Sequence, residues 1–178
     1  MRWRSVLAFA SALAACPAQA APQGFSLAPE SAQLAFRAYG LGVVPIDGAF
    51  TRFAGTLQLD PGDPAMCAVD ITAEAASLQM PEASMTRDAL GDDLLDATRH
   101  PSFAYRGVCR SGRLHGMLLL HGVTRPLTME VSIVNGRWAA TGRMQRADWG
   151  MGAHPMLAGP EVRLQIVAAI PPGFPNRP

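Results

Sequence analysis

The chain has 178 residues, and its 15 basic residues nearly balance its 14 acidic ones. A near-neutral chain that has no lysine and no run of arginines is a poor binder of nucleic acid, so we expect no nucleic-acid partner. After the first 20 residues there is no second long apolar run, and we expect no transmembrane segment.

Residues 1–20 have the composition of a secretory signal peptide. A basic start is followed by an apolar run too short to span a bilayer, and Ala18 and Ala20 form a small-x-small cleavage site. The segment also contains a lipobox that ends at Cys16, where lipidation would make this cysteine the new N-terminus. Both alternatives predict export to a bacterial periplasm, with residues 21–178 forming a single domain.

Alternation of apolar and polar residues with a period of two predicts β-strands over most of the exported chain. Eight strands are expected around residues 33–38, 53–59, 67–78, 103–109, 114–120, 127–133, 137–145 and 162–170. Residues 81–97 have helical composition instead, and Gly91 is expected to divide them into two short helices.

Short turns fix how these strands pair. Asn135-Gly136 predicts a type I′ hairpin turn that sets Ile133 opposite Trp138. A turn at residues 122–125 is expected to precede it and another at residues 111–112. All three turns give the same apolar face to the strands between residues 103 and 145, which predicts an antiparallel meander.

Cys67 and Cys109 remain after export. If they face each other on neighbouring strands, Asp70 lies opposite Arg106 in a favourable charge pair. Two cysteines in an oxidising compartment predict one disulfide. Two buried free thiols are the alternative.

A sheet of eight strands with one apolar side must cover that side. Closing into a barrel achieves this and removes the sheet edges, while a two-sheet sandwich is the alternative. An eight-stranded barrel either fills itself or holds one small ligand.

Small residues on the predicted inner face favour a pocket. Gly107, Gly116, Gly142, Ala38 and Ala73 point inward, where a filled barrel needs bulk. We therefore expect empty space between the glycines. The alternative is that they only relieve strand curvature.

We expect no metal site and no catalysis. The four histidines show no H-x-x-x-H spacing, and His115 and His121 are roughly 20 Å apart on one strand; the histidines are His100, His115, His121 and His154. No G-x-S-x-G motif occurs. The acidic residues Asp92, Asp93 and Asp96 form either a solvated helix face or the mouth of a site.

Four segments resemble the YceI-like family of periplasmic proteins. "LLLHGVTRPLTMEV" is similar to the family's LTLHGVT segment, and the other three matches occur in the family's order. They are "DGAFTRFAGTLQLDP", "LLDATRHPSFAYRG" and "TGRMQRADWGMG". The resemblance covers about residues 29–170.

The resemblance implies an extended, lipocalin-like antiparallel barrel that binds an isoprenoid or similar long-chain lipid and has a short helical insertion. We expect such a tail to lie along inward-facing apolar residues, namely Phe36, Phe53, Ile71, Phe103, Tyr105, Leu118, Met129, Ile133 and Trp138.

The headgroup is less defined. Many family members have a histidine where Tyr39 stands, and D-x-H-L where residues 87–90 read "RDAL". If those histidines hold a headgroup, the resemblance implies a different headgroup or an uncharged lipid here. Arg87 and Arg146 are candidate partners for a pyrophosphate, whereas the alternative for Arg146 is a structural corner with Trp149.

These features predict a periplasmic lipid-binding protein without a cofactor. The alternative is a structural or interaction module with a filled barrel, accessory to a membrane partner.

Overall fold

The computed structural model describes residues 21–41, 43–63, 65–153 and 158–170. The predicted signal peptide, Cys16 and His154 lie outside the described residues. The strands are β1 (Gln23–Leu27), β2 (Ala32–Gly40), β3 (Val44–Phe50), β4 (Phe53–Leu59), β5 (Cys67–Glu74), β6 (Leu78–Gln79), β7 (Ser102–Arg110), β8 (Arg113–Leu120), β9 (Val123–Val134), β10 (Arg137–Gln145) and β11 (Ala158–Ala169). One α-helix, α1 (Ala83–Leu90), and two 3-10 helices, η1 (Ala75–Ser77) and η2 (Arg146–Trp149), complete the elements.

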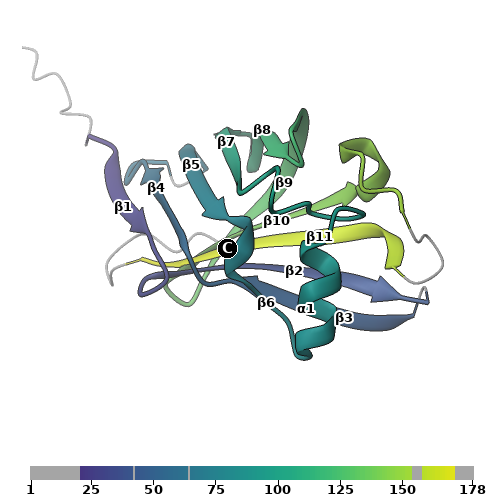
Figure 1. The fold of residues 1–178 in the computed structure, drawn as a ribbon. Coiled ribbons are helices and arrows are strands. Elements are labelled where there is room, and N and C mark those ends of the chain that lie inside the picture. Colours follow the sequence, from purple (N-terminus) through teal and green to yellow (C-terminus); the bar gives the residue numbers. More distant parts are fainter. Residues whose placement is uncertain (1–20, 42, 64, 154–157, 171–178) are drawn as a thin grey trace, which may run out of the picture.

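The strands form one antiparallel sheet in the order β1-β4-β5-β7-β8-β9-β10-β11-β2-β3-β6. The sheet curls so that β7 and β8 lie across the interior from β2 and β3, as Figure 1 shows. Among the described residues no pairing joins β1 to β6. The sheet is therefore a half-barrel, and neither a barrel closed by hydrogen bonds nor a two-sheet sandwich.

The expectation of eight strands is wrong, because the described chain has 11. The strand most clearly missed is β3, which contains Pro45, Asp47 and Gly48, residue types of low β-propensity. Gly48 faces the ring of Phe36 closely, so a Cβ at this position would meet the end of that ring unless the ring shifts. The other additional strands, β1 and β6, have 5 and 2 residues.

The meander from β7 to β10 has the shared apolar face that its turns predict. Ile133 pairs with Trp138 across the turn at residues 135–136, and Gly107 pairs with Gly116. One step further, β5 pairs with β7 and sets Asp70 opposite Arg106, with 3.0 Å between Asp70 Oδ2 and Arg106 Nε. These predicted pairings are confirmed.

The predicted register between β8 and β9 is wrong. The turn consists of His121 and Gly122, whose φ angles are 51° and 71°, so Leu118 pairs with Arg125 and Met129 pairs with Leu114. The predicted turn centred on two β-branched residues, which adopt positive φ poorly. The partner of each β8 residue moves by four positions, and this even shift keeps the same side chains inside.

Only one of the two expected helices forms. Helix α1 ends at Gly91, and the chain then continues as successive turns in which Leu94 and Asp96 donate backbone hydrogen bonds to the Gly91 carbonyl. The prediction of a second helix is therefore wrong. The turns keep residues 91–95 close to the interior of the sheet.

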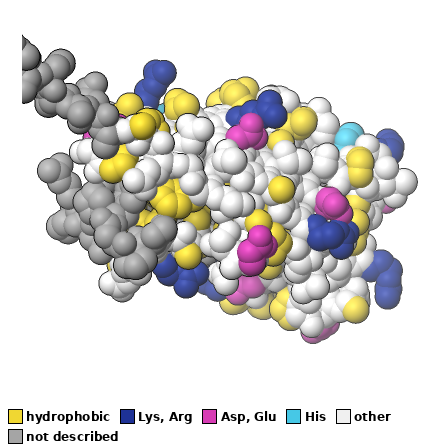
Figure 2. All heavy atoms as spheres, turned by 90° about the vertical axis from the view of Figure 1, so that its left-hand side faces the viewer, with side chains coloured by type: hydrophobic (Ala, Val, Ile, Leu, Met, Phe, Trp, Pro, Cys, Tyr) yellow, Lys and Arg dark blue, Asp and Glu magenta, His cyan; other side chains and the backbone are white. Residues whose placement is uncertain are grey.

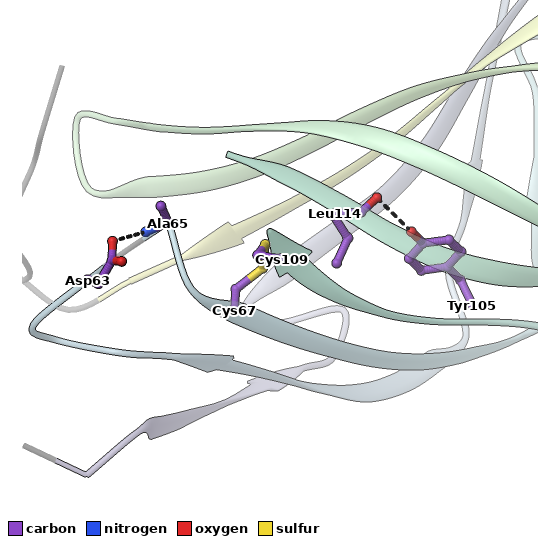
Figure 3. The surroundings of a disulfide bond; sticks show 6 residues. All are labelled: Asp63, Ala65, Cys67, Tyr105, Cys109 and Leu114. Atoms are coloured by element: carbon purple, nitrogen blue, oxygen red, sulfur yellow. Dashed lines mark hydrogen bonds between the residues drawn. A yellow bond between two sulfur atoms is a disulfide. The ribbon is translucent and has the colours of Figure 1, made fainter. Parts of the chain in front are cut away.

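The predicted disulfide is present. Cys67 at the start of β5 bonds to Cys109 near the end of β7, with 4.7 Å between their Cα atoms. Figure 3 shows this bond together with Tyr105, whose hydroxyl reaches the Leu114 carbonyl. The alternative of two free thiols is wrong.

Candidate ligand-binding pocket

A cavity of about 680 Å³ opens into one end of the half-barrel beneath α1 and residues 91–95. We call it the helix-side pocket. Strands from both halves of the sheet, α1 and the connecting segments contribute mostly apolar side chains to its wall. These are Phe36, Ala38, Ile46, Phe50, Met80, Met85, Ala89, Leu94, Leu95, Phe103, Leu118, Leu120, Met144, Met151, Val162 and Leu164. Such an apolar, concave wall is typical of sites that hold small organic ligands.

The opposite end of the half-barrel is filled. The strand register sets Leu59 opposite Cys67 and Leu114 opposite Cys109 at this end. The largest fully buried side chains are Trp138, Leu27, Leu57, Leu59, Leu114, Met129 and Cys109. A small cavity of about 40 Å³ lies between the two ends and shares Phe50, Phe103, Leu118 and Leu164 with the helix-side pocket. The interior is therefore packed at one end and hollow at the other.

The structure divides the nine predicted tail-binding residues into three groups. Phe36, Phe103 and Leu118 line the helix-side pocket. Ile71, Tyr105 and Met129 line only the small cavity.

Phe53, Ile133 and Trp138 line neither cavity. Trp138 is completely buried at the filled end, and Ile133 pairs with it. Sequence alternation identifies inward-facing residues correctly, but it does not state how far along the barrel each one lies.

The expected space between the inward glycines is absent. A Cβ on Gly116 would lie 2.6 Å from the Tyr105 hydroxyl oxygen, and one on Gly142 would lie 2.9 Å from Met129 Cγ. The side chains of Tyr105 and Met129 fill these positions. None of Gly107, Gly116 and Gly142 borders either cavity. The location predicted for the hollow is therefore wrong.

Charged residues from α1 and the following turns border the helix-side pocket. Arg87 and Asp88 come from the helix, and Asp92 and Asp93 follow it, all with exposed side chains. Arg87 thus lies at the border of this pocket. Asp92 and Asp93 lie at the pocket border, which is the position expected if these acidic residues form the mouth of a site.

Arg146 also borders the pocket, but it is buried. Its guanidinium donates to the carbonyl oxygens of Gly159 (2.9 Å), Met151 (2.6 Å) and Ala153 (3.3 Å). Burial lowers its pKa. These bonds give Arg146 the structural corner role that was its alternative.

Sequence reasoning missed the contribution of the helix and of three methionines to the pocket. Met80, Met85 and Met151 line it, together with Met144, for which a lining role is predicted from the inner strand face. On α1, Met85 and Ala89 are four residues apart and therefore lie on one helix face, a spacing that was readable in the sequence. Methionine side chains adapt to irregular apolar ligands.

A second hollow of about 510 Å³ lies over the outer face of β2, β3 and β11. Its border includes Arg37 and Asp47, which form a two-pronged ion pair with distances of 2.6 and 2.8 Å. Arg37 lowers the pKa of the Asp47 carboxyl. Because an ion pair and Arg163 border this hollow whereas the wall of the helix-side pocket is mostly apolar, the helix-side pocket is the better candidate for an apolar ligand.

The face of the molecule drawn in Figure 2 has no single dominant charge. On the end of the molecule drawn in Figure 2, basic and acidic side chains are interspersed over the described part of the surface. Among the described helices, none combines the length and the apolar composition needed to cross a bilayer.

Comparison with known proteins gives the family. A model of the YceI-like domain matches residues 25–170. Protein YceI of Shigella flexneri is 31% identical over 104 residues, which are 56% of this chain and 54% of that protein. The chain thus matches about half the length of this curated relative.

Two solved structures share the fold. Burkholderia cenocepacia BcnA superposes with a TM-score of 0.63 at 18% identity, covering 76% of this chain and 94% of BcnA. A polyisoprenoid binding domain from Saccharophagus degradans, implicated in plant cell wall breakdown, gives 0.57 at 12% identity and covers 82% and 98% of the two chains. The half-barrel with its single helix is the fold of these solved structures, and the family model matches residues 25–170. The chain therefore belongs to the YceI-like domain family.

Proposed function

We propose that this protein binds the long apolar tail of an isoprenoid or similar lipid in the helix-side pocket. The observation that carries the proposal is the contrast between the two ends of the interior. One end is packed around Trp138, while the other leaves about 680 Å³ between mostly apolar walls. An apolar ligand fills a cavity with such walls without leaving buried polar groups unpaired.

Binding of an apolar tail requires no chemical step. Each methylene group that leaves water contributes about 0.8 kcal/mol, so a tail of ten or so carbons binds without a cofactor. We therefore propose a carrier, store or sensor that leaves its ligand unchanged, and we assign no catalytic residue.

Two further features support a polyisoprenoid ligand in the periplasm. The similar Saccharophagus degradans structure is described as a polyisoprenoid binding domain. The Cys67–Cys109 disulfide is typical of an oxidising compartment and supports export. We propose Arg87 as the contact for an anionic end group, because its exposed side chain borders the pocket whereas Arg146 bonds to carbonyl oxygens.

The test is native mass spectrometry of the protein purified gently from a bacterial periplasm supplied with varied lipids. We expect one lipid molecule per chain, released on denaturation, and a rise in melting temperature when prenyl lipids are added to the stripped protein. A protein that carries no added mass and gains no thermal stability would instead support an interaction module.

A further inference from the structure

Behind the wall of the helix-side pocket, three side chains that can bind a metal come together. One ligand atom from each of Asp96, His100 and His121 lies within 4.8 Å of the other two. Asp96 and His100 belong to the turns that follow α1, where the His100 amide donates to the Asp96 carbonyl at 2.8 Å. His121 comes from the turn between β8 and β9, and its ring centroid is 4.7 Å from that of His100.

Hydrogen bonding fixes the tautomer of His121. Its Nδ1 lies 3.0 Å from the carbonyl oxygen of Trp149, which only accepts hydrogen bonds, so Nδ1 carries the proton. In the neutral ring Nε2 then has a lone pair. This atom is buried and has no hydrogen-bond partner among the described residues. Metal-binding histidines are typically held in this way, with the second nitrogen donating to a backbone carbonyl.

The carboxylate of Asp96 is also buried, with a side chain that is 5% exposed. Its Oδ1 accepts a hydrogen bond from the Arg99 amide at 3.3 Å. Its Oδ2 pairs with the Arg99 guanidinium, but that contact is not aligned as a hydrogen bond. Beside the two imidazoles, Asp96 therefore keeps a buried carboxylate oxygen that has no aligned hydrogen bond and is available to a metal cation.

The two segments are already positioned against each other. A Cβ on Gly122 would lie 2.7 Å from Cε1 of His100, so a glycine is needed at this place for the ring to approach the turn. Gly122 also has a φ of 71°, which glycine adopts without strain.

We propose that Asp96, His100 and His121 bind one zinc ion or a similar late first-row divalent metal. Two imidazole nitrogens and one carboxylate oxygen suit zinc, whereas calcium and magnesium prefer oxygen ligands alone. Two ligands of one tetrahedral zinc ion lie roughly 3.3 Å apart, so ligand atoms that now lie up to 4.8 Å apart draw together by up to about 1.5 Å on binding. The fourth position remains for water.

The bound ion would link two segments that contribute to the pocket wall. Residues 91–95, which precede Asp96, line the helix-side pocket, and so does Leu120, which precedes His121. A bound metal therefore restrains the turns after α1 relative to the β8–β9 turn. This role is separate from lipid binding, and the metal is titrated into lipid-free protein so that failure of either proposal can be distinguished.

The experiment is calorimetric titration of Zn²⁺ into untagged protein that has been treated with a chelator. We expect one ion per chain, and a loss of affinity of at least about tenfold in each of His100→Ala, His121→Ala and Asp96→Asn. His115→Ala is the matched control, because His115 is an exposed histidine on the outer face of β8. It should bind zinc as the unchanged protein does.

If one of these variants fails to fold, measurements on the unchanged protein still test the proposal. In the unchanged protein, bound Zn²⁺ should slow hydrogen exchange of the backbone amides in residues 91–100. When Co²⁺ is bound in place of Zn²⁺, the protein should show the strong visible absorption of a four-coordinate Co²⁺ site. The absence of saturable binding overturns the proposal. Binding that survives the His100→Ala and Asp96→Asn substitutions unchanged overturns it as well, since the ion then lies elsewhere.

Discussion

The ring of Tyr105 occupies the space in front of Gly116. A Cβ built on Gly116 would lie 2.6 Å from both Cζ and the hydroxyl oxygen of Tyr105, closer than real Cβ atoms approach any neighbour. The same hydroxyl lies within hydrogen-bond distance of the carbonyl oxygens of Leu114 (3.2 Å) and Leu127 (3.0 Å). The small residue on β8 therefore accommodates a buried tyrosine and not a ligand.

Gly116→Ala should destabilise the fold whether or not lipid is present. The added methyl group meets Tyr105 and the Arg106 carbonyl oxygen, 2.3 Å away, and such overpacking costs about 1–3 kcal/mol. Urea unfolding measures the loss. Gly24→Ala on β1 is the matched control, because a Cβ there has no neighbour within 4 Å. Equal unfolding midpoints for the two variants would contradict this account of Gly116.

Alkaline pH should destabilise the protein through Tyr105. Burial raises the pKa of its hydroxyl above the ordinary value near 10. The unfolded state releases the tyrosine proton near pH 10, whereas the folded state keeps it up to the raised pKa. Stability is therefore lost as pH rises above about 10.

The measurement is phenolate absorbance in a Tyr39→Phe background, where Tyr105 is the remaining tyrosine. Ionisation should coincide with unfolding followed by circular dichroism. Tyr105→Phe should weaken this alkaline transition and cost about 1–2 kcal/mol at neutral pH, because buried carbonyls lose a donor. Ionisation of Tyr105 well below the unfolding transition would contradict the prediction.

Removing the disulfide should weaken the fold but leave the pocket. The bond joins residues 42 positions apart, and a loop of this length gives a stabilisation of about 4 kcal/mol in the chain-entropy estimate. We expect Cys67→Ala/Cys109→Ala to lower the unfolding midpoint in urea accordingly. Under conditions where the variant remains folded, lipid binding should persist, since the disulfide lies at the filled end. Loss of binding in the folded variant would show that the two ends are coupled.

Filling the pocket from the helix should displace the lipid. Ala89 on α1 lines the helix-side pocket, so an indole in Ala89→Trp occupies volume that a tail needs. Displacement of two methylene groups lowers affinity by roughly tenfold. Ala83→Trp, on an exposed position of the same helix, is the control and should bind normally. Comparable affinity in both variants would place the ligand elsewhere.

Arg87→Gln should weaken binding of lipids with anionic end groups selectively. An exposed ion pair contributes up to about 1 kcal/mol, so the loss is at most about fivefold and decreases with added salt. Lipids with uncharged ends should bind equally to both proteins, and Arg113→Gln, an exposed arginine on β8, should have no effect. A similar loss for charged and uncharged lipids would exclude Arg87 as the end-group contact.

The sequence by itself determined which side chains face inward and which strands of the meander pair. Alternation has a period of two, and the turn residues at positions 111–112 and 135–136 fix φ locally, so this information lies within short segments. Once Cys67 was assumed to face Cys109, the same arithmetic set Asp70 beside Arg106, and the structure contains both pairs. Where the turn chemistry was less distinctive, at His121-Gly122, the face was still correct although the register was not.

Only the tertiary structure decided where the interior is hollow. Whether a glycine leaves space depends on side chains of neighbouring strands, and Tyr105 and Met129 fill the positions that the sequence alone leaves open. The pocket depends on α1 lying against the open end of the half-barrel, a contact between segments that no local pattern encodes. The meeting of Asp96 and His100 with His121 has the same origin, because it joins two turns that are distant in sequence. Local chemistry sets the direction of each side chain, whereas packing between distant segments sets what that side chain meets.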